Sequence, residues 1–157
     1  MSLMPDLLED ALKSLPHGPE FRFVDRLLSM VPGQKGVGEY LVRGDEYYLR
    51  GHLQGEPLFP GVLLIEAAAQ VAGMVAQNDP EFPAFQGLKL TALRSVKLLG
   101  TARPGETLVI EAAITGRLGH LIQAKAAASV SGVQVMSAEL TLCGTVARPA
   151  GVQTPAR

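Results

Sequence analysis

Three polar residues in and before an apolar stretch have the types and the spacing for acid–base chemistry. Between residues 62 and 76 the only polar side chains are Glu66 and Gln70, and His52 lies fourteen residues before the glutamate. A histidine can accept a proton near neutral pH, and a carboxyl group removed from water keeps its proton more readily. The pair could therefore take a proton from one atom of a substrate and donate a proton to another.

The segment that carries Glu66 and Gln70 is predicted to be a largely buried helix over residues 60 to 77. Pro60 suits a helix start, and the sequence Asn-Asp-Pro after the segment ends it. Residues four apart lie one above the other on a helix face, so the carboxyl and the amide are neighbours. Since helical side chains lean toward the helix start, Glu66 is expected to point toward the loop that carries His52.

The same residues admit a purely structural interpretation. Glu66 could lie on a narrow exposed stripe of the helix with Gln70 beside it, and His52 could be an ordinary loop residue. Small residues in the helix would let another backbone pack closely, or would leave room for a ligand or a second helix: Ala67, Ala68, Ala72 and Gly73. The helix pattern alone leaves these alternatives open.

Composition places these residues in an ordinary globular chain. The 157 residues are 47% apolar and 18% charged, which suits a single domain with a hydrophobic core. A net charge of -1 and the lack of a basic run give no reason to expect nucleic acid. The acidic start of the chain is unlike a secretion signal, and no apolar run is long enough to cross a membrane.

The cysteine count agrees with a cytoplasmic location. Cys143 is the only cysteine of the chain, so no internal disulfide can form and no cysteine metal site is expected. Disulfides are rare in the reducing cytoplasm, which we predict as the location of the protein. Neither a metal nor another cofactor is predicted.

The segments around the central helix predict an antiparallel sheet. We predict a short amphipathic helix over residues 5–14, a strand with a bulge over 21–31, its hairpin partner over 37–43, and loop with at most a helical turn over 44–59. Later strands are predicted over 87–100, 107–118, 121–132 and 133–146. One apolar helix needs cover on most sides, so we expect an α+β fold in which a curved sheet wraps around it. The domain would span residues 1–147, followed by a disordered tail over 148–157.

Three segments carry a resemblance to a known family. "GHLQGEPLFPGVLLIEAAAQ" at residues 51–70 contains a Gly-His, a Pro-Gly-Val-Leu and a Glu-Ala at the family's spacing. "LPHGPEFRFVDR" at 15–26 and "RPGETL" at 103–108 are similar to its opening motif and to one of its turns. The chain thus resembles the β-hydroxyacyl-ACP dehydratases of fatty acid synthesis, of the FabZ type, over about residues 15 to 142. Glu66, rather than an aspartate, favours the FabZ-like branch over the FabA-like branch.

The resemblance implies a fold, a reaction and a role for each residue. It implies the hotdog fold and the removal of water from a (3R)-3-hydroxyacyl thioester to give a trans-2-enoyl thioester. His52 would take the C2 proton, and Glu66 would protonate or orient the departing 3-hydroxyl. Gly61 matches the position that binds the thioester carbonyl, and a helix start offers free N–H groups for this. The expected substrate-binding residues are Gly61, Val62, Phe59, Leu63 and Gln70, with the acyl chain in an apolar tunnel between subunits.

The resemblance also implies partners. The substrate would be carried by acyl carrier protein or coenzyme A, with neither nucleic acid nor membrane involved. The active unit would be a homodimer, alone or in a trimer of dimers, with the histidine from one subunit and the glutamate from its neighbour. Because acyl carrier protein is acidic, a basic patch is expected near the tunnel mouth. Candidates for the patch, which could equally be ordinary solvated charges, are Arg94, Lys97 and Arg103.

Other motif residues are expected to be structural. His17 and His120 are assigned turn or packing roles, and Asp25 with Arg26 is predicted to form an ion pair. The chain departs from the family pattern at residues 53–54, where Leu-Gln replaces the Phe-Pro that follows the family's histidine. This departure leaves open a non-catalytic protein that binds acyl thioesters. A hotdog thioesterase that hydrolyses acyl-CoA is a second alternative, since it also uses a helix carboxylate but needs no histidine at this spacing.

Overall fold

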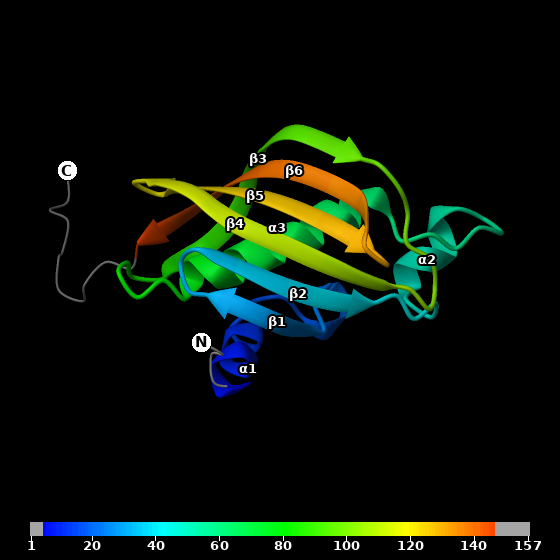
Figure 1. Ribbon diagram of the computed structural model, residues 1–157, viewed down its shortest axis with the longest axis horizontal. Helices are drawn as coiled ribbons and strands as arrows, with labels where there is room; N and C mark the ends of the chain where they lie inside the picture. The colour runs from blue at the N-terminus through cyan, green and yellow to red at the C-terminus, as the bar shows by residue number, and fades with distance from the viewer. Residues whose placement is uncertain (1–4, 147–157) are drawn as a thin grey trace, which may run out of the picture.

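A long helix, α3 (Gly61–Gln77), runs across one face of a curved antiparallel sheet (Figure 1). The computed structural model describes residues 5–146. Ten of the seventeen helical residues are buried, and the helix contacts strands across the sheet from β2 to β3. The helix is apolar on nearly every side because the sheet curves around it. The predicted central helix and the predicted α+β architecture are both confirmed.

Six strands make up the sheet in the described part of the chain. They are β1 (Arg26–Val31), β2 (Lys35–Leu41), β3 (Phe85–Leu98), β4 (Thr107–Leu118), β5 (Leu121–Val130) and β6 (Val133–Val146). Their order in the sheet is β1-β2-β4-β5-β6-β3, with every pair antiparallel. The alanine-rich β5 alternates exposed and buried residues along its length. This period of two suits a strand with one face on the core, and it overrides the helix propensity of alanine.

Two local features let the sheet close around α3. The edge strand β3 changes register with β6 at three places, and such shifts bend and twist a strand. On β2, glycines allow the helix to come close: a Cβ on Gly36 would lie 2.7 Å from Val75 Cγ2, and one on Gly38 would lie 3.2 Å from Val71 Cγ2. Side chains at these positions would push the helix off the sheet.

The N-terminal third departs from the predictions in one segment. Helix α1 (Pro5–Lys13) confirms the predicted first helix, and a short helix α2 (Tyr47–His52) forms in the predicted loop region. The strand predicted from residue 21 begins only at Arg26, after a 3-10 turn at Pro19–Phe21. The reason is that the Phe23 N–H is bonded to a side chain of α3 and not to a neighbouring strand. The predicted tail at 148–157 lies outside the described residues.

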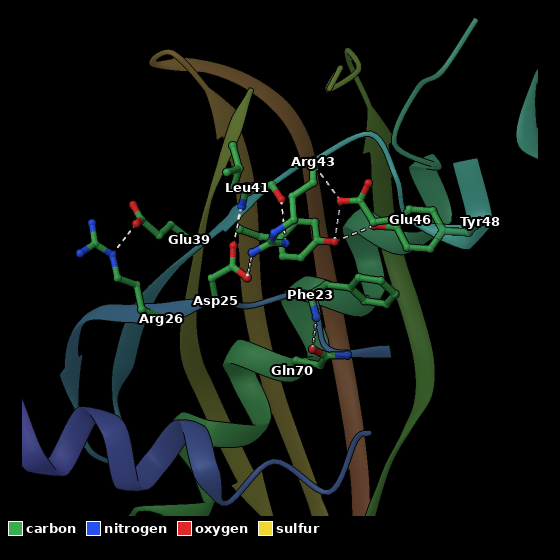
Figure 2. A network of polar contacts seen from close by, with 10 residues as sticks. Phe23, Asp25, Arg26, Glu39, Leu41, Arg43, Glu46, Tyr48 and Gln70 are labelled. Carbon is green, nitrogen blue, oxygen red and sulfur yellow. Dashed lines mark hydrogen bonds and ion pairs between the residues drawn. The ribbon is translucent and has the colours of Figure 1, made fainter. Parts of the chain in front are cut away.

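The predicted Asp25–Arg26 ion pair is wrong. Asp25 instead pairs with Arg43, at 2.6 Å between Oδ1 and Nη2, and Arg26 pairs with Glu39 on β2, as Figure 2 shows. Consecutive residues of an extended chain point to opposite sides, so neighbours in sequence rarely meet. Each partner lies across the hairpin that leads to α2.

Candidate active site

His52 stands at the end of α2, with its ring fixed by one hydrogen bond. Its Nδ1 lies 3.0 Å from the carbonyl oxygen of Leu58. A carbonyl can only accept, so Nδ1 carries the proton, and Nε2 of the neutral ring keeps a free lone pair. Leu58 lies two residues before Pro60, which caps the start of α3. The contact therefore holds a potential base close to the first turn of α3.

A partly buried polar network at the start of α2 holds the helix that carries His52 (Figure 2). The hydroxyls of Tyr40 and Tyr48 are 2.8 Å apart, and the Tyr40 hydroxyl donates to Glu46 Oε1 at 3.1 Å. The carboxylate also accepts the backbone N–H groups of Arg43 and Gly44, each at 2.7 Å. One carboxylate thus accepts the free backbone N–H groups of the turn before α2.

The pKa values of this network follow from its burial. Desolvation raises the pKa of Tyr40 to about 12. The pKa of Tyr48 is raised as well, first by burial and then by its hydrogen bond with Tyr40. Burial also works to raise the pKa of Glu46, but hydrogen bonds from backbone N–H groups and from Tyr40 outweigh it and lower that pKa. The network therefore keeps both phenols neutral and the carboxylate charged at neutral pH.

The first turn of α3 offers backbone donors beside β3. The Leu63 N–H bonds back to the Pro60 carbonyl at 2.9 Å, while the N–H groups of Gly61 and Val62 belong to the unpaired first turn that every helix has. A Cβ on Gly61 would lie 2.8 Å from Leu98 Cδ1. Glycine thus lets the Leu98 side chain pack against the first turn, at the positive end of the helix dipole.

Glu66 is held by two N–H donors and is only partly shielded from water. Its Oε1 lies 3.2 Å from His17 Nε2 and 3.2 Å from Gln70 Nε2, and its side chain is 24% exposed. Gln70 is 2% exposed. Its amide also accepts the Phe23 N–H, as Figure 2 shows, and donates to the Phe21 carbonyl, each at 2.9 Å. Gln70 therefore does not lie on an exposed stripe of the helix. Its amide holds Glu66, whereas a contact with substrate was expected.

A cavity of about 590 Å³ with a mainly apolar lining, which also includes Lys89, extends from Glu66 along α3. It lies between α3, β3 and the segment that follows α1, and Glu66 and His17 both line it. Gln77 borders it eleven residues further along, about 16 Å at the rise of an α-helix. Its apolar lining includes Ala69, Met74, Leu88, Leu90 and Leu142.

The residues expected to line a tunnel between subunits lie elsewhere in this chain. Phe59 is 1% exposed, with its ring packed against Phe23, Tyr40 and Tyr48, so it belongs to the core. Neither Phe59 nor residues 62 and 63 border this cavity. Val62 is instead 68% exposed, and Leu63 packs on the core.

Within one chain, the histidine that meets Glu66 is His17 and not His52. Helix geometry predicted that Glu66 points toward the loop of His52, but His52 does not border the cavity that Glu66 lines. His17, which was expected to be structural, is the residue that the sequence analysis missed. Its position in the "LPHG" segment was the only available signal, because the residue it meets is 49 positions away.

No three His, Cys, Asp or Glu side chains come together as a potential metal site among residues 5–146. No helix in the described part of the chain has the length and hydropathy of a membrane span. Of the predicted basic patch, Arg103 lies 3.9 Å from Glu56, and Arg94 and Lys97 are exposed on β3.

The chain is similar to known proteins over most of its length. The family model described as the FabA-like domain matches residues 15–139. The 3-hydroxyacyl-[acyl-carrier-protein] dehydratase FabZ of Thermoanaerobacter pseudethanolicus is 38% identical over 132 residues, covering 84% of this chain and 92% of the relative. The FabZ of Chloroflexus aggregans is 32% identical over 138 residues, covering 88% of this chain and 95% of the relative.

Solved structures share the fold at low identity. The dehydratase heterocomplex ApeI:P of Xenorhabdus doucetiae matches with a TM-score of 0.71 and 17% identity, over 87% of this chain and 90% of that one. A hypothetical thioesterase with coenzyme A from Streptococcus pneumoniae matches with a TM-score of 0.59 and 16% identity. The match covers 78% of this chain and 87% of that one. The predicted hotdog fold is confirmed, and the chain belongs to the FabA-like family, among the FabZ-type 3-hydroxyacyl-ACP dehydratases.

Proposed function

We propose that this protein removes water from a (3R)-3-hydroxyacyl thioester of acyl carrier protein, giving the trans-2-enoyl thioester in fatty acid biosynthesis. The observation that carries the proposal is the position of Glu66, which is held by two N–H donors at one end of an apolar cavity. The FabZ relatives, similar over most of the chain, support the same reaction. They do not favour the thioesterase or the non-catalytic alternative.

Each residue has a defined part in the proton balance. Nε2 of His52 takes the C2 proton while the N–H groups of Gly61 and Val62 bind the thioester carbonyl, where negative charge develops. Glu66 gives its proton to the 3-hydroxyl, directly or through a water, and the C–O bond breaks to release water. His52 is then an imidazolium and Glu66 a carboxylate, and exchange with solvent restores both. No metal or redox group takes part in these steps.

The proposed active unit is a homodimer in which His52 of one subunit serves Glu66 of the other. Support comes from β3, an edge strand that is exposed over most of its length and pairs in the described chain only with β6. Unpaired edges are a template for pairing with another strand. Exposed apolar side chains gather on and just after β3: Leu93, Val96, Leu98 and Leu99. The alternative assembly that we propose is a trimer of these dimers.

The acyl chain is proposed to occupy the cavity along α3. This assignment replaces the tunnel lining first expected, because Phe59 lies in the aromatic core. Val62 and Leu63 would remain near the thioester end, at the start of α3. An acidic carrier protein would meet Arg94, Lys97 and Arg103, and the reaction would take place in the cytoplasm.

A hydration assay tests the proposal. Wild type, His52→Ala and Glu66→Gln are incubated with a medium-chain trans-2-enoyl thioester, and loss of the conjugated absorbance is followed together with free thiol. We expect loss of conjugation by the wild type alone, without thiol release. Free thiol with conjugation retained would indicate a thioesterase. Bound thioester without any turnover would indicate a binding protein.

A further inference from the structure

The His17 ring is in contact with the proposed acid of the reaction. Its Nε2 lies 3.2 Å from Glu66 Oε1, and the ring stacks on Phe21 with 6.3 Å between centroids. The backbone carbonyl of His17 also accepts a hydrogen bond from Arg22 Nη2 at 3.2 Å. The side chain and the backbone of His17 are thus both fixed, on the segment between α1 and the 3-10 turn.

The surroundings of the second ring nitrogen of His17, Nδ1, indicate where the ring carries its proton. His17 Nδ1 is buried and has no hydrogen-bond partner among the described residues. A proton there would be a buried donor without an acceptor, which costs more than a bare lone pair in the same place. The tautomer favoured by these surroundings is neutral, with its single proton on Nε2. The contact with Glu66 is therefore a hydrogen bond that His17 donates, and not an ion pair.

Two donors on one oxygen determine where the carboxyl proton of Glu66 sits. Gln70 Nε2 and His17 Nε2 both point at Oε1, each at 3.2 Å. The oxygen that bears the proton of a carboxyl group is the poorer acceptor, so Oε1 acts as the carbonyl oxygen. The acidic proton is left on Oε2. The amide of Gln70 cannot turn away, because it is also bonded to the backbone of Phe21 and Phe23.

We propose that His17 is a positioning residue for Glu66, which fixes the transferable proton on Oε2 in the dehydration proposed above, on which this inference rests. When Oε2 gives its proton to the departing hydroxyl, Glu66 becomes a carboxylate. The hydrogen bonds from His17 and Gln70 then become charge-assisted and strengthen as negative charge develops. His17 keeps its own proton throughout, so the proton balance between His52, Glu66 and substrate is unchanged.

Two variants separate the hydrogen bond from the packing. His17→Phe keeps a ring against Phe21 but removes the donor, whereas His17→Gln keeps an N–H near the position of Nε2. For His17→Phe we expect kcat to fall about 10- to 100-fold, the range for losing a hydrogen bond to a charged group. We expect KM and the melting temperature to stay close to those of the wild type. His17→Gln should recover most of kcat.

A control and a second measurement complete the test. His120→Phe, at an exposed turn residue, should leave kcat unchanged. Nitrogen NMR of His17 at neutral pH should show a protonated Nε2 and a bare Nδ1, and a proton on Nδ1 would overturn the inference. It would also be overturned by a His17→Phe enzyme as fast as the wild type, or by a folded His17→Gln enzyme as slow as His17→Phe. A wild type that hydrates no enoyl thioester would instead overturn the proposed function.

Discussion

Glu66 and Gly73 lie seven residues apart on α3, and both border the apolar cavity. At the rise of an α-helix they are about 10 Å apart along the axis. Gly73 leaves open space there, since a Cβ added to it would meet only Leu88 Cδ2, at 3.8 Å. If the acyl chain leaves Glu66 along this cavity, then its length is limited by what stands at position 73.

Gly73→Leu should therefore shorten the range of accepted acyl chains. We expect near-normal kcat/KM with the shortest 3-hydroxyacyl thioesters and a loss of at least about tenfold with long ones, because a leucine side chain would occupy the space of the chain. Gly73→Ala is the matched control. It should keep the chain-length profile and stabilise α3 by about 1 kcal/mol, the helix propensity difference between the two residues. The same loss at every chain length would mean that the acyl chain lies elsewhere.

A site shared between two subunits should be recoverable from two inactive variants. His52→Ala and Glu66→Gln homodimers each lack one residue in both of their sites. When equal amounts are unfolded together and refolded, about half of the dimers are mixed, and each mixed dimer has one complete site, giving about a quarter of wild-type activity. Activity that stays at the level of the separate variants would place both residues in one subunit.

The sequence alone predicts the bounds of those helices and strands whose pattern is visible within the segment itself. The bounds of α3, β4 and β6 agree with the predictions because an apolar run or an alternation between turns is visible within each segment. The contact of His17 with Glu66 has no such signal, since it depends on how the segment after α1 packs on α3. The late start of β1 has the same cause: the Phe23 N–H is bonded to Gln70, not to a strand.

The lining of the cavity depends on curvature that the sequence does not reveal. Three register shifts along β3 decide which of its side chains face α3, and strand patterns predict alternation without such shifts. Phe59 was expected in the lining because it precedes the Pro-Gly helix start. It is taken into the core by three aromatic neighbours that are distant in the sequence.

The tyrosine network before α2 should make stability fall at alkaline pH. The pKa of Tyr40 is about 12 in the folded protein, above the ordinary 10.0, and that of Tyr48 is also raised. The unfolded chain therefore loses its phenol protons first, so the stabilisation is complete below pH 10 and decreases as the pH rises toward 12. The free energy of unfolding, measured with urea, should fall by on the order of 3 kcal/mol for Tyr40 alone. Tyr40→Phe/Tyr48→Phe should flatten the dependence, and Tyr47→Phe, at a 52% exposed phenol, should not.

A nearly buried ion pair joins the turn after α3 to strand β4. Arg117 Nη2 lies 3.3 Å from Asp79 Oδ2, with side chains 13% and 10% exposed. The guanidinium also donates to the Ala76 carbonyl at 2.8 Å and lies 4.6 Å from the centre of the Phe82 ring. Asp79→Ala should lower the free energy of unfolding by about 3 kcal/mol, because it leaves a shielded cation without its counter-ion.

A double variant that removes both charges separates the cost of an unpaired charge from the loss of the ion pair itself. Arg117→Met with Asp79→Asn should cost less than Asp79→Ala alone, since no unpaired charge remains in the turn. Arg103→Ala is the matched control, because Arg103 and Glu56 lie 3.9 Å apart with about 60% exposure each. An exposed pair of this kind is worth less than about 1 kcal/mol. Equal losses in the Arg103 and Asp79 variants would mean that the shielding of Arg117 contributes nothing to the stability of the turn, and that water reaches its guanidinium as freely as it reaches Arg103.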